Sequence, residues 1–232
     1  MESLRGIISD VRVFLYGGVL TLPLTIAGTL LILGLFTANY AMLFFLVGYL
    51  ILVPLANWIL HFLPFFDRID GDICKINIPY STMSNPVGRG SMIKDFGSTW
   101  VSMIAFFIGY IFTNGLELYN RESVDTEIKV TATSGSDLDK KVSARKTQAI
   151  VTMISTIIFA IGVLAFRYYT GCENMWSLVL NTFVFVWFGH GWYKALSSVG
   201  EDRLSDLFGI ANRLLPPGAI ANGPIACVPI RA

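Results

Sequence analysis

The chain has 232 residues, of which 54% are hydrophobic and 14% are charged, and its formal net charge is +1. Soluble domains carry about 25% charged residues, whereas the mean hydropathy here is +0.62. Composition therefore excludes a soluble enzyme, a nucleic-acid-binding domain and a disulfide-rich secreted module. The sequence predicts an integral membrane protein of the all-α class, because backbone polar groups in lipid must be satisfied within each segment.

The first predicted element is a short amphipathic helix over residues 1–16, lying in the membrane interface. Its apolar residues recur at helical spacing: Leu4, Ile7, Ile8, Val11 and Leu15. Five transmembrane helices follow, since a bilayer core of about 30 Å needs about 20 apolar residues in helical form. They cover residues 17–36 and 41–62, which form a hairpin over 17–62, then 97–116, and finally 147–166 and 174–193 within the unit 147–193.

The hairpin is the most apolar part of the chain. No Asp, Glu, Lys or Arg occurs between Arg12 and Asp67, and this run is long enough for two crossings. Pro23 and Pro54 lie inside the two spans, where proline removes a helical hydrogen bond and kinks the helix locally. The kinks are either tolerated distortions or a gating hinge.

Two longer segments are expected to lie outside the membrane. Residues 63–96 form a turn-rich loop, with Asp70-Gly71-Asp72 and Asn85-Pro86 among its turn formers, placed to cap the bundle or to contact a partner. Residues 117–146 form a polar loop, in which 127–133 alternates like a strand and 133–137 predicts a turn. The basic residues that lead into the fourth span either fix orientation or bind anionic headgroups or an acidic partner.

Five crossings place the termini on opposite sides of the membrane. The side of the C-terminus then holds ten Lys and Arg residues against seven on the other side, and this excess favours a cytoplasmic C-terminus. Cys74 and Cys172 fall on the same side, so they are a possible disulfide if that side is oxidising. The alternative is that both are free thiols.

The five spans contain no Asp, Glu, Lys or Arg, whereas ionisable residues within spans normally mark transport pathways. The polar residues that remain are expected to form hydrogen bonds between helices: Thr21, Thr25, Thr29, Asn57, Asn114, Thr152, Ser155, Thr156, Asn181 and His190. Ala105 and Gly109 form a pair of small residues four apart, which indicates close helix packing. The spans are therefore interpreted as structural helices rather than as the lining of a transport pathway.

One segment raises the possibility of enzyme chemistry. The run from Asp67 to Lys75 resembles the first half of the CDP-alcohol phosphatidyltransferase motif, D-x-x-D-G-x-x-A-R, whose carboxylates would hold Mg²⁺ against a diphosphate. The run departs from that motif at Cys74 and Lys75, and the motif's second half is missing. Asp67 and Asp70 are as readily explained as solvated turn residues, so we expect no catalytic residue, no cofactor and no metal.

The C-terminal unit, residues 194–232, predicts an amphipathic helix followed by an extended tail. Ser198 and Glu201 have the spacing of a capping box, and Pro224 and Pro229 interrupt the apolar tail. Apolar surface left in water is costly, so the tail from Gly218 to Ala232 is expected to lie against its own bundle or a neighbouring subunit. The predicted partner-docking residues are Leu204, Leu207, Phe208, Leu214, Leu215, Pro216 and Pro217.

The same region carries a resemblance to a known group of proteins. Residues 200–210 (GEDRLSDLFGI) and 212–217 (NRLLPP) resemble membrane proteins of the nucleocytoplasmic large DNA viruses, mainly through 206–210. In those viruses an internal lipid membrane lies beneath an icosahedral capsid, and small multi-span proteins there contact minor capsid proteins. The resemblance implies a place in the virion internal membrane and a minor capsid role.

The sequence thus predicts a non-enzymatic structural membrane protein of a multi-protein assembly. Its expected partners are the lipid bilayer and neighbouring membrane or capsid subunits, with no nucleic acid. Three alternatives remain open at this point. They are a small transporter or channel, supported by the kinked spans and the intramembrane Asn and Thr residues, an accessory subunit of an organellar membrane complex, and a CDP-alcohol-type phosphotransferase.

Overall fold

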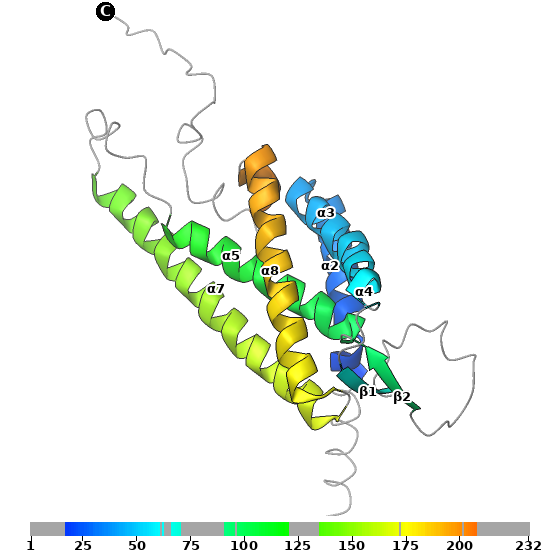
Figure 1. Ribbon diagram of the computed structural model, residues 1–232. Coiled ribbons are helices and arrows are strands. Elements are labelled where there is room, and N and C mark those ends of the chain that lie inside the picture. Colours follow the sequence, from blue (N-terminus) through cyan, green and yellow to red (C-terminus); the bar gives the residue numbers. More distant parts are fainter. Residues whose placement is uncertain are drawn as a thin grey trace, which may run out of the picture.

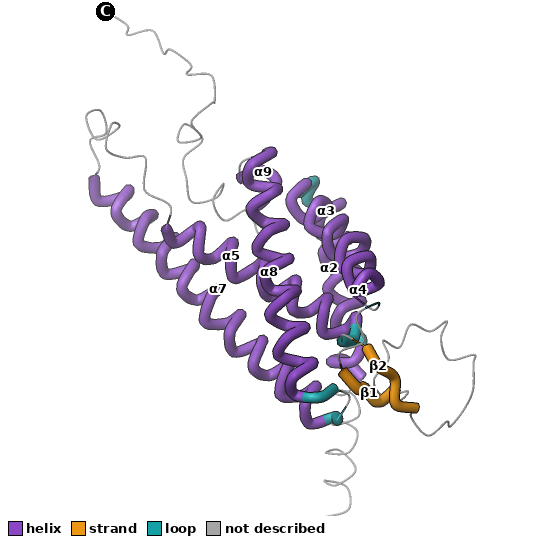
Figure 2. Tube along the Cα trace, viewed as in Figure 1, coloured by secondary structure: helices purple, strands orange, loops and turns teal. Residues whose placement is uncertain are grey.

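The computed structural model describes residues 17–60, 62, 66–70, 91–95, 97–120, 135–171, 173–200 and 202–207. It is a bundle of helices with one small pair of strands beside it (Figures 1 and 2). The helices are α2 (Leu22–Phe36), α3 (Tyr40–Val47), the π-helix η1 (Gly48–Leu52), α4 (Val53–Leu60), α5 (Thr99–Asn120), α7 (Gly135–Tyr169), α8 (Met175–Gly200) and α9 (Asp202–Ser205). The strands are β1 (Phe66–Asp70) and β2 (Ser91–Asp95).

Among the described residues, three helical stretches are long and apolar enough to cross a membrane. They are Tyr40–Leu60, Thr99–Asn120 and Ser143–Tyr169, and they correspond to the second, third and fourth predicted spans. The prediction of a membrane-associated helical protein is confirmed at these three. The first predicted span corresponds to α2, which has 15 residues, and the fifth corresponds to α8, which has 26.

The helix α5 forms the centre of the bundle. It contacts α2, α4, α7 and α8, and α8 crosses it near its middle (Figure 1). The crossing is tight, because a Cβ added at Gly109 would lie 2.2 Å from the carbonyl oxygen of Val186, and one at Gly189 would lie 2.2 Å from that of Phe106. Small residues allow two backbones to approach this closely, so the predicted packing role of Gly109 is confirmed.

The two prolines of the hairpin have different effects on their helices. Pro23 lies in the first turn of α2, directly after a break at Thr21 that separates the helical residues 17–20 from α2, and an interruption is the expected effect of a proline inside an apolar span. Pro54 follows the π-helix η1, in which the Val53 N–H reaches back to the carbonyl of Gly48. A π-helical turn next to a proline is a common way for a helix to absorb the lost hydrogen bond.

The loop predicted over residues 63–96 contains secondary structure that the sequence analysis missed. β1 and β2 pair antiparallel, with Phe66 opposite Asp95 and Asp70 opposite Ser91, a short hairpin beside a fold that is otherwise helical as predicted. Each strand has 5 residues, which is too short for a clear alternation to stand out from the surrounding turn formers. Residues 71–90, including Cys74, lie outside the described part of the chain.

The helix α7 begins at Gly135, well before the predicted start of the fourth span at residue 147. The predicted turn over 133–137 is therefore wrong from Gly135 onward. The charged stretch before the apolar segment contains the helix formers Leu138, Lys140, Lys141, Ala144, Arg145 and Lys146, so the helix begins before the apolar segment. The strand-like residues 127–133, the N-terminal helix over 1–16 and Cys172 lie outside the described residues.

The C-terminal unit differs from its prediction at the cap. α8 continues through Ser198 to Gly200, and the Ser198 hydroxyl donates to the carbonyl of Ala195 at 2.8 Å, so Ser198 does not start a new helix. The short helix α9 follows. Leu207 is fully buried in the chain's own core, and Leu204 packs against that core. The other five predicted docking residues lie outside the described part: Phe208, Leu214, Leu215, Pro216 and Pro217.

Candidate functional site

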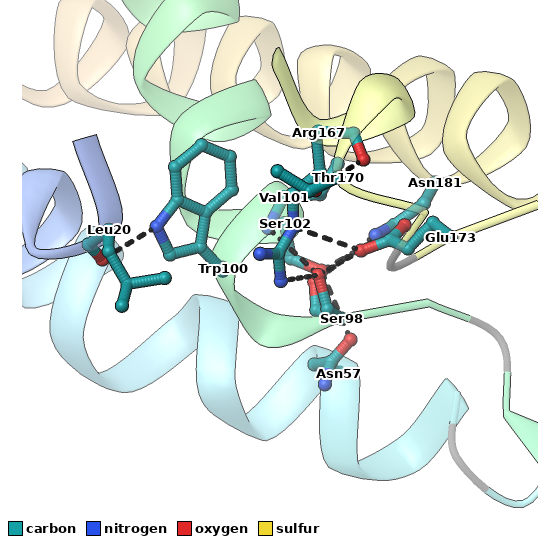
Figure 3. Close-up of polar contacts among 10 residues, drawn as sticks. All are labelled: Leu20, Asn57, Ser98, Trp100, Val101, Ser102, Arg167, Thr170, Glu173 and Asn181. Carbon is teal, nitrogen blue, oxygen red and sulfur yellow. Dashed lines mark hydrogen bonds and ion pairs between the residues drawn. The ribbon is translucent and has the colours of Figure 1, made fainter. Parts of the chain in front are cut away.

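A buried polar cluster lies where α5 begins (Figure 3). Ser98 stands directly before α5, and its Oγ accepts a hydrogen bond from the Val101 N–H at 3.3 Å. This is the geometry of an N-cap, in which a serine oxygen satisfies one of the free N–H groups of the first helical turn. The start of α5 is therefore fixed by a side chain that also belongs to the cluster.

An ion pair adjoins Ser98. Arg167, in the last turn of α7, has its Nε 3.7 Å from Oε1 of Glu173, and the two side chains are only 1% and 0% exposed. The Ser98 hydroxyl donates to Glu173 Oε1, and Arg167 Nη2 donates to Ser98 Oγ at 3.4 Å. Because each buried charge costs several kcal/mol to desolvate, the cation and the carboxylate stabilise each other and keep this region neutral.

The guanidinium of Arg167 also contacts an aromatic ring. It lies over the Trp100 ring, 4.8 Å from the centroid, which is a favourable cation–π distance. The indole Nε1 of Trp100 donates to the carbonyl of Leu20 at 3.0 Å. The chain that leads into α2 is thereby tied to the ends of α5 and α7.

A second layer of the cluster is made of amides and hydroxyls. Asn57 of α4 donates from Nδ2 to Thr99 Oγ1 at 2.9 Å. The Ser102 hydroxyl lies 3.1 Å from Oδ1 of Asn57 and 3.1 Å from Oδ1 of Asn181, and Asn181 Nδ2 donates to the carbonyl of Ser98 at 3.3 Å. These contacts join α4, α5 and α8 through one serine.

The cluster is enclosed by protein. Ser102 and Asn181 are 0% exposed and Ser98 is 5% exposed. A Cβ added at Gly97 would lie 2.5 Å from Nδ2 of Asn181, so no larger residue fits there. Donors face acceptors and a cation faces a carboxylate across helix boundaries, and this arrangement is suited to holding helices together.

The end of the bundle opposite the polar cluster is held by single hydrogen bonds and an exposed ion pair. Tyr110 donates to the carbonyl of Ser205 at 2.9 Å, and Asn39 Nδ2 donates to that of Leu207 at 3.2 Å, so α9 is fastened to α3 and α5. Lys194 and Glu117 form an ion pair whose side chains are 50% and 41% exposed. An exposed pair of this kind contributes little to stability.

The polar residues predicted to link helices divide into two groups. Asn57 and Asn181 do link helices and meet at Ser102, while Nδ1 of His190 lies 3.1 Å from the Thr113 hydroxyl on α5. Several threonines instead donate to the carbonyl four residues earlier in their own helix: Thr21, Thr25, Thr152 and Thr156. Amides reach across a helix interface, whereas a threonine hydroxyl is close enough to satisfy itself locally.

Sequence reasoning missed the charged half of the cluster. Arg167 and Glu173 fall between the fourth and fifth predicted spans, 147–166 and 174–193, where charged residues are expected to lie in the interface. The available signal was their opposite charge across a connection of only a few residues between two spans, which keeps both near the bundle. Ser98 could have been recognised from its place directly before a helical apolar run.

The possible phosphotransferase motif and the possible disulfide stay predictions. Asp67 and Asp70 lie in β1, paired through the backbone with Lys94 and Ser91. In the described part of the chain, no three His, Cys, Asp or Glu side chains gather at a point where they could hold a metal. Cys74 and Cys172 are both outside that part.

Comparison of the chain with protein-family models, with curated proteins and with solved structures gives no match.

Proposed function

We propose that this chain is a non-enzymatic structural protein of a multi-protein membrane assembly. It crosses the bilayer five times, through α2, the continuous stretch α3–η1–α4 (Tyr40–Leu60), α5, α7 and α8. The enclosed polar cluster is the observation that carries the proposal. It uses its charged groups and its amides to hold one helix to another, with Ser102 and Asn181 0% exposed. A transport site would instead present such groups to a water-filled path.

The outer helices support the same role. In the apolar part of Ser143–Tyr169 only 17% of the residues are buried within the chain, and in that of Tyr40–Leu60 only 28% are. A broad apolar surface of this kind is available to lipid and to neighbouring subunits. A rigid bundle with an apolar perimeter is suited to holding a position within a membrane-bound assembly.

The placement of the chain in a virion internal membrane, with a minor capsid role, draws on the resemblance of residues 200–217 to membrane proteins of the nucleocytoplasmic large DNA viruses. α9 lies against α3 and α8, so the described part of the chain reaches Leu207 at that end of the bundle. In this proposal Leu204 and Leu207 anchor the C-terminal unit. The docking of neighbouring subunits falls to Phe208, Leu214, Leu215, Pro216 and Pro217.

The test is a truncation that ends at Leu207, which keeps α9 and the buried Leu207 side chain. We expect the truncated chain to remain folded in the membrane but to lose the subunits that co-purify with the full-length chain. A full-length Leu214→Asp/Leu215→Asp variant is the matched control, because it should lose the same subunits without a change of length. Full retention of those subunits by both variants would contradict the docking role, and their identity separates a virion from an organellar complex.

A small transporter is the second candidate, because Asn57 and Asn181 meet at Ser102 inside the bundle. The assay is solute and ion flux in liposomes that contain the purified chain. We expect flux no greater than in protein-free liposomes. Flux that is present with the native chain and lost with Asn57→Ala or Asn181→Ala would favour the transporter.

A further inference from the structure

The helices α7 and α8 meet at their shared turn and diverge from it (Figure 1). The space between them near the turn is an apolar groove of about 630 Å³. Its walls come from Ile161 and Leu164 on α7 and from Leu178, Val179 and Phe183 on α8. Because Phe183 and Val179 are 61% and 51% exposed, the α7–α8 groove opens to the outside of the bundle, on the side that lipid would cover.

We propose that the α7–α8 groove is a binding site for an acyl chain of a membrane lipid. The inference depends on the membrane location of the chain and not on its structural role. The first reason is length. The lining of the groove on α8 runs from Met175 to Val186, which at 1.5 Å per residue is about 16 Å, or about half of a bilayer core of ~30 Å.

That length distinguishes between the two obvious occupants. A transmembrane helix of a neighbouring subunit is about 10–12 Å wide and crosses the whole core, so it needs a wide groove along the full length of α8. An acyl chain is narrow and ends near the bilayer midplane. A groove confined to one leaflet therefore fits the lipid chain.

The second reason is the position of the mouth of the groove, the end at which an acyl chain would enter it. The groove begins at the turn between the helices, where Tyr168, Tyr169 and Met175 line it. Tyr169 is 86% exposed and the neighbouring Trp176 is 72% exposed. Exposed Tyr and Trp side chains gather at the level of the lipid headgroups, so the mouth lies where an acyl chain enters the hydrocarbon.

The third reason is that buried contacts fix the positions of the two helices that line the groove. Arg167, at the end of α7, and Glu173, in the turn, form the buried ion pair beside Ser98. This pair fixes the turn against α5 and so fixes the angle at which α7 and α8 separate. A groove with fixed walls binds one chain in one place, whereas ordinary lipid contact with a helix is unspecific.

The experiment uses the full-length chain in detergent micelles, with phosphatidylcholine that carries a photoreactive acyl chain added as the probe. After irradiation, the labelled residues are mapped by mass spectrometry, with and without an excess of unlabelled lipid. We expect saturable labelling within residues 161–169 and within residues 175–186. Labelling at Ile150 and Ile158, which are 41% and 65% exposed on the rest of α7, should not saturate.

Two variants place a large side chain in the groove, Val179→Trp and Ala165→Trp, and each should abolish the saturable labelling. Ile158→Trp is the matched control on α7 outside the groove and should leave it unchanged. Uniform, unsaturable labelling along both helices would overturn the site and leave only general lipid contact. Labelling at Ile150 and Ile158 but not within residues 161–169 and 175–186 would overturn it, because the groove would then be closed to lipid.

Discussion

The helices α5 and α7 are both candidate membrane spans, yet they occupy opposite positions in the bundle. The α5 stretch has a mean hydropathy of 1.5 and is 78% buried, whereas the Ser143–Tyr169 stretch of α7 has a mean hydropathy of 2.5 and is 17% buried. In a soluble protein the more apolar helix would be the one inside. Here the surrounding solvent is lipid, which is as apolar as a leucine side chain, so apolar character is not a reason for burial.

The residues on the two helices show which interactions, in place of the hydrophobic effect, determine which helix is buried. α5 buries Ser102 and Thr113, whose hydroxyls contact Asn181 and His190 of α8, and Gly109, which allows close backbone contact. α7 exposes a row of large aliphatic side chains to the outside: Ile150, Ile154, Ile157, Ile158 and Ile161. Helix association in this chain thus rests on close packing and polar contacts, the forces that remain when the hydrophobic effect between helices is absent.

The largest expected effect comes from enlarging a glycine at the crossing of α5 and α8. Gly109→Leu would place its Cβ 2.2 Å from the carbonyl oxygen of Val186, and backbone cannot yield as a side chain can, so the loss should exceed the ~1–3 kcal/mol of ordinary overpacking. We expect no folded, monodisperse protein by size-exclusion chromatography in detergent. Gly162→Leu on α7 is the control, since nothing lies within 4 Å of its added Cβ. Equal behaviour of the two variants would mean that the crossing is not tight.

The next effect concerns the one charged residue that α7 buries at its end. Arg167→Met leaves Glu173 buried without the cation that faces it, and loss of one partner of a buried pair costs about 3–5 kcal/mol. Thermal unfolding in detergent should show a large decrease in the midpoint. Arg167→Met/Glu173→Gln should recover much of this loss, because the neutral amide can share hydrogen bonds without an unpaired charge. A double variant no more stable than Arg167→Met would argue against an ion pair.

A smaller loss is expected at the helix cap. Ser98→Ala removes the N-cap of α5 and one hydrogen bond to Glu173, together worth about 2 kcal/mol. The corresponding change on α7, Ser155→Ala, alters an exposed residue and should be close to neutral. The two midpoints of thermal unfolding, measured side by side, check this difference. A Ser98→Ala chain as stable as the native one would show that another group caps α5.

The smallest effect is expected on the lipid-facing side of α7. Ile158 is 65% exposed, so Ile158→Ala should change the free energy of unfolding by no more than about 0.5 kcal/mol. Phe106→Ala on α5 serves as the comparison, because Phe106 is 0% exposed and its loss should cost about 3–5 kcal/mol. A substantial effect at Ile158 in the isolated chain would mean that α7 has a protein neighbour on that face.

The positions of the helices could be predicted closely from the sequence. The second span was expected at 41–62 and is found at Tyr40–Leu60, and the third was expected at 97–116 and is found at Thr99–Asn120. This is because a span needs a continuous apolar run, which is a local property of the sequence. The ends of α7 and α8 were predicted less well, since the polar residues beyond the apolar run continue the helix by their own propensity.

The sequence by itself determined that this chain is a helical membrane protein and where its apolar helices lie, because the cost of placing charge or free backbone in lipid acts on each segment separately. The tertiary structure alone decided which helix is central, and that Arg167 and Glu173 turn inward to Ser98 while Asn57 and Asn181 meet at Ser102. These outcomes depend on how helices far apart in sequence cross. Hydropathy does not encode that geometry, because in lipid the packing of small and polar residues decides it.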